Sequence, residues 1–201
     1  MPTRLLLQEI TRTVAREQAA ETLVVWPVGA LEQHGPHLPV GTDYFAVESL
    51  SRAAAQQAAT QIPVLVAPTL PFGSSQHHLP FGGTMSLSTE VYYRIVYELA
   101  ESLIISGFRK IFIINGHGGN NELVQLVARD LALKHPVSMA AASYWTVAWD
   151  ALVALDAHKP GRLPGHAGAF ETSLILALHP DLVQEPRPHR DNVAGSDPRS
   201  F

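Results

Sequence analysis

The segment KIFIINGHGGN (residues 110–120) gives the most direct indication of the fold. Lys110 to Ile114 is a short β-branched and aromatic run, which is typical of a strand buried in a sheet. The glycines after it lead into a helical pattern over about 121–134. A strand, a tight loop and a helix in this order form the unit from which parallel α/β sheets are built.

The same alternation extends along the chain in both directions. The expected strands are 23–28, 63–67, 110–114 and 137–143, and the expected helices are 5–20, 44–59, 89–106, 121–134 and 168–178. Thr3 is a candidate cap for the first helix, and Gly107 is expected just past the end of the third. We therefore predict an α/β fold with a mostly parallel sheet and helices on both faces, within a single domain over 1–201 whose last part, about 182–201, is an irregular tail.

The composition limits the classes of function. The 201 residues are 46% hydrophobic and 16% charged, and they carry a net charge of −4 without a basic cluster. Nucleic-acid and membrane partners are therefore not expected. The absence of cysteine excludes disulfides and thiolate metal sites. The N-terminus turns polar too early for a signal peptide, and no apolar run approaches the ~20 residues of a membrane span. The expected location is the cytoplasm.

A group of polar residues that suits a metal ion follows the first expected strand, in EQHGPHLPVGTD (residues 32–43). Glu32 and His34 are two residues apart, so in an extended backbone both side chains point to the same side. Gly41 is expected to let the chain turn and bring Asp43 back towards them. Carboxylates and imidazoles are ligands for Zn, Mn or Fe(II). Taken alone, the segment fits equally well a hydrogen-bonded turn followed by a helix that Asp43 caps.

A second cluster, NGHGGN (residues 115–120), follows the strand at 110–114. It lacks the Lys-Ser/Thr pair of a phosphate loop and the glycine spacing of a dinucleotide site, so a nucleotide-binding function ranks last. The glycines leave space around His117, which suits a metal ligand. A histidine that only hydrogen-bonds the backbone of a tight turn is the alternative. Asn115 and Asn120 are expected to hold the loop in place.

A third cluster lies before the last expected helix. Gly165 and Ala167 flank His166, so its imidazole is sterically free and suits a proton shuttle. Glu171 follows five residues later. It is either a ligand or an acidic residue that stabilises the first turn of the helix through the helix dipole.

Several other side chains are weaker candidates. His37 stands at an odd offset from His34 and is expected to lie behind the ligands or at the surface. His78 is the candidate for substrate contact in the loop 71–86, although a solvated histidine is the alternative there. Tyr144 and Trp145, just past the fourth strand, are candidates to contact a flat substrate, with core packing as the alternative.

The number of candidate ligands favours two ions over one. A catalytic zinc usually has three protein ligands, whereas five are available here: Glu32, His34, Asp43, His117 and Glu171. Two divalent ions carry four positive charges, three carboxylates leave one, and a bridging hydroxide would cancel it. The set therefore suits a binuclear hydrolase in which Asp43 bridges the ions.

The segments EQHGPHLPVGTD, NGHGGN and HAGAFETS, in this order, resemble the creatininase (creatinine amidohydrolase) family over about 22–180. The resemblance implies a three-layer α/β/α fold, two divalent ions (Zn, Mn or Fe), and hydrolysis of a cyclic or small amide C–N bond. By position, Glu32, His34, Asp43 and His117 match the metal ligands of the family, with Asp43 bridging. His166 matches the histidine that transfers a proton. Family members commonly form hexamers, so a homo-oligomer is expected.

The chain departs from that family at two positions. Creatininases have a glutamate where this chain has Gly119 and an acidic residue where it has Gly165, so creatinine itself is not the expected substrate. Glu171 is the candidate for the missing carboxylate. The NGHGGN form is more similar to relatives that act on formylamino-pyrimidine intermediates or on a peptide-derived redox cofactor. Relatives usually continue further, so this chain is expected to be a truncated or short form whose pocket a neighbouring subunit completes.

The main hypothesis is therefore a metal-dependent amidohydrolase of a small-molecule amide. In it a hydroxide bridged between two ions attacks the amide carbon, and His166 passes a proton to the leaving nitrogen. The alternative from another class is a ligand-binding or scaffold protein that keeps the fold without the activity.

Overall fold

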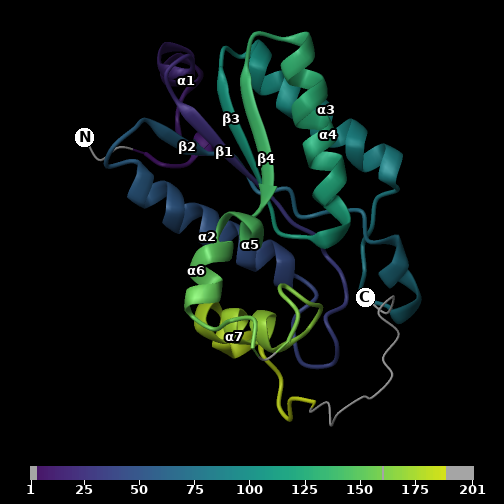
Figure 1. Cartoon of the computed structure of the whole chain (residues 1–201). Helices are drawn as coiled ribbons and strands as arrows, with labels where there is room; N and C mark the ends of the chain where they lie inside the picture. Colours follow the sequence, from purple (N-terminus) through teal and green to yellow (C-terminus); the bar gives the residue numbers. More distant parts are fainter. Residues whose placement is uncertain (1–3, 160, 189–201) are drawn as a thin grey trace.

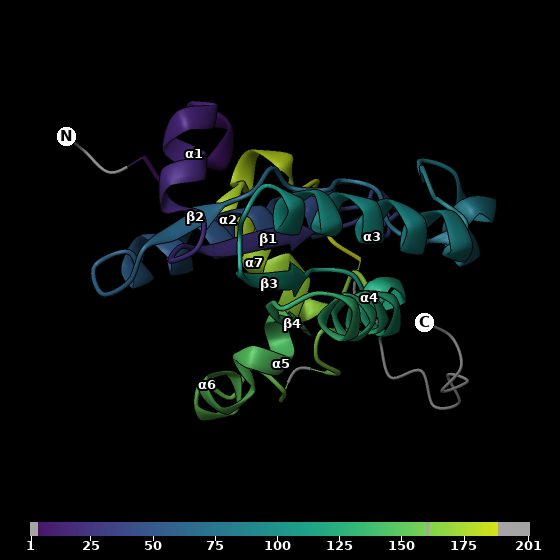
Figure 2. The same cartoon turned by 90° about the horizontal axis from the view of Figure 1, so that it is seen from above.

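A sheet of four parallel strands forms the centre of the protein, for which a computed structural model describes residues 4–159 and 161–188. The strands lie side by side in the order β2-β1-β3-β4, with α1 beyond the β2 edge and α5 and α6 beyond the β4 edge (Figure 2). Their bounds are β1 Leu23–Val28, β2 Val64–Val66, β3 Lys110–Asn115 and β4 Ser138–Ser143. All four expected strands are thus confirmed, within one or two residues.

The helices of the described residues alternate with these strands along the chain (Figure 1). The α-helices are α1 Arg12–Gln18, α2 Thr42–Ala58, α3 Thr89–Ile105, α4 Asn121–Lys134, α5 Tyr144–Val147, α6 Trp149–Ala154 and α7 Ala169–Leu178. Four short 3-10 helices are η1 Leu7–Glu9, η2 Gln76–Phe81, η3 Gly118–Asn120 and η4 Pro180–Leu182. The expected helices over 44–59, 89–106, 121–134 and 168–178 are confirmed, and Gly107 follows α3 with a left-handed φ of 108°.

The sheet is covered on both faces, which makes the fold the predicted three-layer α/β/α arrangement. Val24 and Trp26 of β1 point towards α3 and α4 and pack in the larger apolar cluster. Val25, one position along, points to the opposite face and packs against Ala55 of α2. Burial on both faces explains why β1 is a continuous apolar run.

The predicted first helix begins too early. Only residues 12–18 of the expected 5–20 form α1, and Thr11 caps it by accepting a hydrogen bond from the amide of Val14 at 3.4 Å. Leu5 is instead extended, and its carbonyl accepts a bond from the amide of Val66 in β2 at 2.8 Å. The chain start therefore pairs with the edge strand and partly buries Leu5 and Leu6 there, which outweighs helical propensity. The candidate cap Thr3 lies outside the described residues.

The predicted cap of α2 is also wrong. Asp43 was considered as the cap, but Gly41 is the N-cap residue of α2, and no side chain accepts a hydrogen bond from the first amides of this helix. Asp43 lies in the first turn, so its carboxylate is not used for capping. Gly41 lies in the turn that leads into α2, and Asp43 comes back to within 3.3 Å of His34, as expected. The glycine with a left-handed backbone in this loop is Gly35, at φ 65°. Gly41 is needed because a Cβ there would lie 2.9 Å from the ring of Phe45.

The region between β4 and α7 holds two helices that were not predicted, α5 and α6. The last described residues, 183–188, contain neither helix nor strand, and most of the expected irregular tail, residues 189–201, lies outside the described part. Every helix within 4–159 and 161–188 is too short or too polar to span a lipid bilayer.

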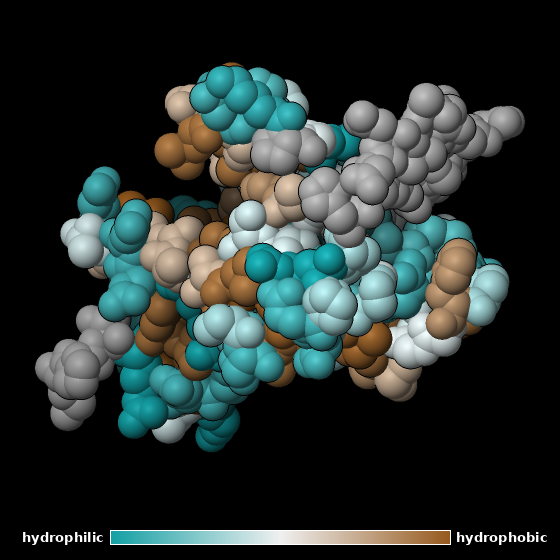
Figure 3. Space-filling view, turned by 90° about the horizontal axis from the view of Figure 1, so that it is seen from below, coloured by the Kyte–Doolittle hydropathy of each residue, from teal (hydrophilic) through white to brown (hydrophobic). Residues whose placement is uncertain are grey.

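The carboxyl ends of three strands are level, because Val28 of β1 lies beside Asn115 of β3, which lies beside Ser143 of β4. In Figure 1 this end of the sheet faces down, towards α5 and α7. Hydrophilic and hydrophobic residues alternate over the visible part of the molecule seen from this end (Figure 3). In open α/β folds ligands bind at this end of the sheet, and the candidate site residues lie there.

Candidate metal centre

The five predicted ligands come from separate segments and meet in one buried cluster. Glu32 and His34 follow β1, Asp43 is in the first turn of α2, His117 follows β3, and Glu171 is in the first turn of α7. Each of the five residues is at most 6% exposed. Buried charged and polar groups at this density must compensate one another or hold an ion.

Among the described residues, four groups of three side chains could hold a metal ion, and two of these groups share Asp43. The other two are Glu32 with His34 and His166, and Glu32 with His77 and His78. Glu32, Asp43 and His117 can converge on one position, and His34, Asp43 and Glu171 on a second. Asp43 reaches both because its two oxygens diverge: Oδ2 lies 3.1 Å from Nδ1 of His117, and Oδ1 lies 3.3 Å from Nε2 of His34. The geometry thus places Asp43 between two candidate ion positions.

The proton of His117 points away from the cluster. Nε2 of His117 lies 3.1 Å from the carbonyl oxygen of Ser74, which can only accept a hydrogen bond. A neutral His117 therefore carries its proton on Nε2 and presents a lone pair at Nδ1. That lone pair faces Oε1 of Glu32 at 3.3 Å and Oδ2 of Asp43 at 3.1 Å. A lone pair facing two carboxylates is repulsive unless a cation lies between them.

His34 is held in the same way as His117, except that Nδ1 faces a backbone carbonyl and Nε2 faces the carboxylates. Nδ1 donates to the backbone carbonyl of Glu32 at 3.1 Å, so a neutral ring has its lone pair on Nε2. Nε2 faces Asp43 Oδ1 at 3.3 Å and Glu171 Oε2 at 3.7 Å. Metal-binding histidines typically donate their second ring proton to a carbonyl or carboxylate in this way.

Two further observations fit a pair of divalent ions. Glu32 Oε2, His34 Nε2 and Asp43 Oδ2 are buried without a hydrogen-bond partner. The facing ligand atoms are 3.1–3.7 Å apart. Two tetrahedral ligands at about 2.1 Å from an ion are separated by about 3.4 Å, so the observed spacing leaves room for an ion in each set.

Protons compete with metal for the same positions. Burial acts to lower the pKa of His117, but Asp43 and Glu32 outweigh it and raise the pKa to about 10. Burial likewise acts to lower the pKa of His34, but the carboxylates of Asp43 and Glu171 outweigh burial and hold this pKa well above its usual value. Burial acts to raise the pKa of Asp43, but the attraction of His34 and His117 outweighs burial, so the pKa of Asp43 lies below its usual value. The metal-free cluster thus takes up protons where metal ions would otherwise balance the carboxylates.

The loop after β3 is held by its asparagines, as expected. Asn115 accepts from the amide of His117 at 3.0 Å and donates to its carbonyl at 2.6 Å. Asn120 bridges two other loops, because it accepts from the amide of Ser74 at 3.0 Å and donates to the carbonyl of Gly29 at 3.0 Å. These bonds fix the backbone on both sides of the imidazole.

Gly119 has a steric reason to be glycine. A Cβ at this position would clash with the backbone oxygen of Ser74 and lie 2.6 Å from Nε2 of His117. The glutamate that creatininases have here could not be accommodated unless these groups moved. Glu171 supplies a carboxylate from α7 instead, and the same carboxylate accepts a hydrogen bond from the amide of Ala167 at 2.6 Å. Glu171 is therefore both a candidate ligand and the acceptor for a backbone amide just before α7.

His166 and His78 stack above the cluster. Their ring centroids are 4.3 Å apart, and the centroid of His166 is 4.4 Å from that of His34. Nδ1 of His166 lies 3.7 Å from Oε1 of Glu32, and Nε2 of His78 lies 3.6 Å from the same oxygen. Burial, with His34 and His78 nearby, lowers the pKa of His166 to about 4, so its ring is neutral at neutral pH.

The remaining candidates are distributed around this cluster. Tyr144 lies on α5, and burial together with the charges of Glu171 and Asp43 raises its pKa well above the usual value. Trp145 packs edge-on against Tyr144 at 5.0 Å. His37 is buried, not at the surface, and Nε2 lies 2.8 Å from the hydroxyl of Thr172, the neighbour of Glu171. It thus lies behind the ligands, which was one of the two expected positions.

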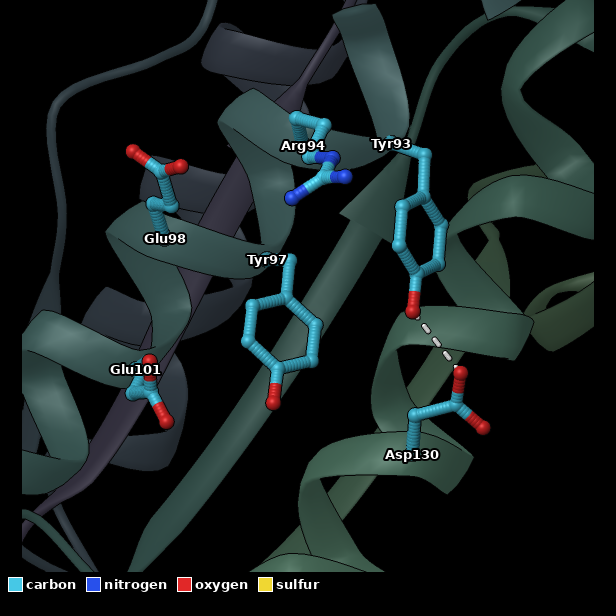
Figure 4. Close-up of a pocket in the computed structure, with 6 residues that line it drawn as sticks. All are labelled: Tyr93, Arg94, Tyr97, Glu98, Glu101 and Asp130. Atoms are coloured by element: carbon cyan, nitrogen blue, oxygen red, sulfur yellow. Dashed lines mark hydrogen bonds between the residues drawn. The ribbon is translucent and has the colours of Figure 1, made fainter. Parts of the chain in front are cut away.

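A separate groove between α3 and α4 contains none of the candidate residues (Figure 4). It is lined by Tyr93, Arg94, Tyr97, Glu98, Glu101 and Asp130. The hydroxyl of Tyr93 donates to Asp130 at 2.7 Å, and Lys134 pairs with Glu101 at 2.8 Å. These pairs lie at an exposed surface, and none of the possible metal groups among the described residues includes a residue of this groove.

Sequence reasoning missed Gln33 and Ser74. Gln33 contacts both His78 and His166, and Ser74 fixes the tautomer of His117 through its backbone. Gln33 could have been considered, because it stands between two candidate ligands. Nothing in the sequence marks Ser74, because its role depends on a carbonyl group that every residue has.

The model of the family described as "Creatininase: Creatinine amidohydrolase" matches residues 8–200. Creatinine amidohydrolase of Pseudomonas putida is 33% identical over 204 residues, covering 93% of this chain and 74% of that protein. The mycofactocin precursor peptide peptidase of Mycobacterium tuberculosis is 34% identical over 177 residues, covering 85% of this chain and 64% of the peptidase. A solved structure named "Creatininase Mn" superimposes with a TM-score of 0.82 at 29% identity, covering 98% of this chain and 81% of that one.

Proposed function

The chain belongs to the creatininase family, and on this basis we propose that it is a metal-dependent hydrolase of a C–N bond in a cyclic or small amide. The observation that carries the proposal is the pair of ligand sets that share Asp43. Two ions held by Zn-, Mn- or Fe-type donors would supply Lewis acidity and a water of lowered pKa. Their ligands are Glu32, His34, Asp43, His117 and Glu171.

The chain's own residues prepare the reaction around that centre. Backbone carbonyls turn the lone pairs of His34 and His117 inwards, so the two rings do not have to reorient when the ions bind. Glu32, His34 and Asp43 are buried, and this keeps bulk water from screening the carbonyl group of the substrate.

His166 is the proposed proton donor to the leaving nitrogen. Hydrolysis adds the hydroxyl of water to the carbonyl carbon, breaks the C–N bond and leaves one proton on the departing nitrogen. Nδ1 of His166 lies 3.7 Å from Glu32 Oε1, beside one candidate ion position. We also propose that Tyr144, Trp145 and His78 contact the substrate. His78 stacks on His166, Tyr144 lies near the charges of Glu171 and Asp43, and Trp145 packs against Tyr144.

A second candidate substrate is a peptide end with a large apolar side chain. Leu79 and Phe81 of η2 are 50% and 72% exposed, and the Phe81 ring lies 6.4 Å from that of His78. Such residues beside the site would favour an apolar group on the substrate, and one relative is a peptide peptidase. The chain covers less than two thirds of that relative, so this remains a second candidate.

A homo-oligomer, a hexamer by family resemblance, is part of the proposal. Val147 and Leu155 are 61% and 78% exposed near α5 and α6, where contact with another copy would cover them. Light scattering coupled to size exclusion would measure the assembly.

The experiment that tests the function combines metal analysis with an amide panel. Protein purified without chelator would be analysed for Zn, Mn and Fe, and then assayed on creatinine, formamides, cyclic amides and a short peptide with a C-terminal aromatic residue. We expect two ions per chain and hydrolysis of at least one compound. A protein that holds no metal even after incubation with Mn or Zn would overturn the proposal, and a loaded but inactive protein would favour the scaffold alternative.

A further inference from the structure

The four histidines that face Glu32 or Asp43 fall into two pairs according to their outer partners. His34 and His117 each direct an outer nitrogen at a backbone carbonyl, which accepts. His78 and His166 instead share a single partner, the carboxamide of Gln33. The type of partner decides which nitrogen of a neutral ring carries the proton.

The orientation of the Gln33 carboxamide follows from the backbone. Its oxygen Oε1 lies 3.0 Å from the amide nitrogen of Gly35, which can only donate. A flipped carboxamide would place two donors opposite each other, so Nε2 must be the atom that faces the histidines. Nε2 carries two protons, and it lies 2.7 Å from Nδ1 of His78 and 3.0 Å from Nε2 of His166.

We propose that Gln33 is a positioning residue: by donating to His78 Nδ1 and His166 Nε2, it holds both rings in the tautomer whose remaining N–H faces Glu32. That proton is on Nε2 of His78, 3.6 Å from Oε1 of Glu32, and on Nδ1 of His166, 3.7 Å from the same oxygen. The chemical roles of the four rings follow. His34 and His117 present lone pairs and can bind ions, whereas His78 and His166 present N–H groups and cannot bind ions through those atoms.

One other observation agrees with neutral rings. His78 and His166 are stacked with an interplanar angle of 19°, an arrangement that two imidazolium ions would disfavour by repulsion. Gln33 itself is fixed by its backbone amide, which donates to the hydroxyl of Thr84 at 3.1 Å.

If the chain is a hydrolase as proposed, this assignment of the tautomers decides which nitrogen of His166 accepts a proton and which one donates it. The ring meets the scissile amide as a hydrogen-bond donor at Nδ1. The attacking water releases one proton as its oxygen bonds to the carbonyl carbon, and His166 takes up that proton at Nε2 as the Gln33 carboxamide moves away. The imidazolium then donates its Nδ1 proton to the leaving nitrogen as the C–N bond breaks. Gln33 therefore prevents the ring from turning into an additional metal ligand while leaving it able to relay a proton.

The test is to observe the tautomers directly. Zinc-loaded protein labelled with 15N in its imidazoles would be examined by long-range 1H–15N correlation, which distinguishes a protonated from an unprotonated ring nitrogen. Signals of His78 and His166 would be assigned from His78→Gln and His166→Gln. We expect a proton on Nε2 of His78 and on Nδ1 of His166. The opposite assignment in either ring of the unaltered protein overturns the proposal, whether or not a substrate is known.

Gln33→Glu supplies the matched perturbation, because a carboxylate of the same shape can only accept. We expect both tautomers to reverse and, if the panel yields a substrate, kcat to fall about 10–100-fold with KM changed less than threefold. Gln56→Glu on the exposed side of α2 introduces the same charge and is expected to change neither. Unchanged tautomers in folded Gln33→Glu protein also refute the positioning role. An inactive protein with the expected tautomers would refute only the hydrolase function.

Discussion

Nδ1 of His117 lies 3.1 Å from Oδ2 of Asp43, yet a neutral His117 has no proton to place between them. The ring already directs its proton from Nε2 to the carbonyl of Ser74, 3.1 Å away. The contact is therefore favourable only with an added positive charge, either a second proton on the ring or a metal ion. This requirement is the basis of the predictions on proton release and on the pH dependence of stability.

Asp43→Ala is expected to abolish activity and to remove both ions. Asp43 is the residue common to the two ligand sets, so its loss leaves each set with two protein ligands. Metal content per chain by mass spectrometry and turnover of a panel substrate would measure the effect. Asp150→Ala, an exposed acid in the first turn of α6, is the matched control and should retain two ions. Near-normal turnover in Asp43→Ala would exclude a bridging role.

Metal binding is expected to release about two protons per chain between pH 7 and 9, one from His34 and one from His117. The pKa of His117 is about 10 without metal, and that of His34 is also raised, so both rings are charged before the ions arrive. The apparent affinity for each ion should then rise about tenfold per pH unit in this range. Calorimetry in buffers of different ionisation enthalpy would count the protons.

The stability of the metal-free protein should fall as the pH rises, whereas the affinity for metal rises. The folded pKa of His117 lies above its unfolded value, so this ion pair contributes fully below about pH 6.5 and is lost as the pH rises towards 10. Chemical denaturation of chelated protein at pH 7 and pH 9.5 should reveal a loss at the higher pH. If stability in chelator is the same at both values, the rings are not charged in the metal-free state.

His166→Gln is expected to reduce kcat by about 100–10,000-fold while leaving two ions bound. His166 is outside the two sets that share Asp43, but it also forms a possible set with Glu32 and His34, so metal content has to be measured. Its Nδ1, which carries the proton in the proposed tautomer, lies 3.7 Å from Oε1 of Glu32. The measurement is kcat with metal content determined on the same sample. His158→Gln, in the exposed loop after α6, should leave both unchanged. Loss of an ion in His166→Gln would make this residue a ligand and not a proton donor.

Gly119→Ala is expected to destabilise the protein by about 1–3 kcal/mol and to weaken metal binding. The added Cβ would lie 2.6 Å from Nε2 of His117 and force the ring or the Ser74 backbone to move. Denaturant unfolding and metal titration would measure both effects. Gly118→Ala is the control one residue away, where a Cβ meets no atom within 4 Å. Equal stability of the two variants would contradict the steric explanation.

Tyr92→Phe is expected to be neutral or stabilising by up to about 1 kcal/mol. The hydroxyl of Tyr92 is fully buried on α3 and has no hydrogen-bond partner, so removing it costs nothing. Tyr93→Phe, the next residue, removes a 2.7 Å bond to Asp130 and should cost about 1 kcal/mol. Unfolding free energies of the two variants, compared side by side, test this difference in sign.

The fold could be predicted where local patterns and tertiary packing agree. The run at 110–114 is apolar in a way that suits burial on both faces, and the structure extends it only to Asn115. Leu5 and Leu6 were misassigned because a helix and an edge pairing bury the same leucines, and only the position of β2 decides between them. The helices α5 and α6 were missed although WDALVALDA is rich in alanine and leucine, which was a usable signal.

For the site, the residue types and their spacing were sufficient to select the five candidate ligands, because carboxylates and imidazoles that follow strands or begin helices at one edge of the sheet converge. The tautomers could not be predicted, because they depend on which backbone carbonyl lies behind each ring. The capping role considered for Asp43 failed for a related reason. Its first-turn position allows capping, but the attraction of two imidazoles is evident only after folding brings β1 and β3 together.

The position of Glu171 has a consequence for the dynamics of the chain. Glu171 and Ile175 are the buried residues of α7, and the carboxylate of Glu171 faces His34, more than a hundred residues earlier in the sequence. Filling the site would therefore join two distant parts of the chain, as a cross-link does. The free energy of local opening at α7 becomes a function of metal concentration, and chelation should speed amide hydrogen exchange in α7 well before it affects α3.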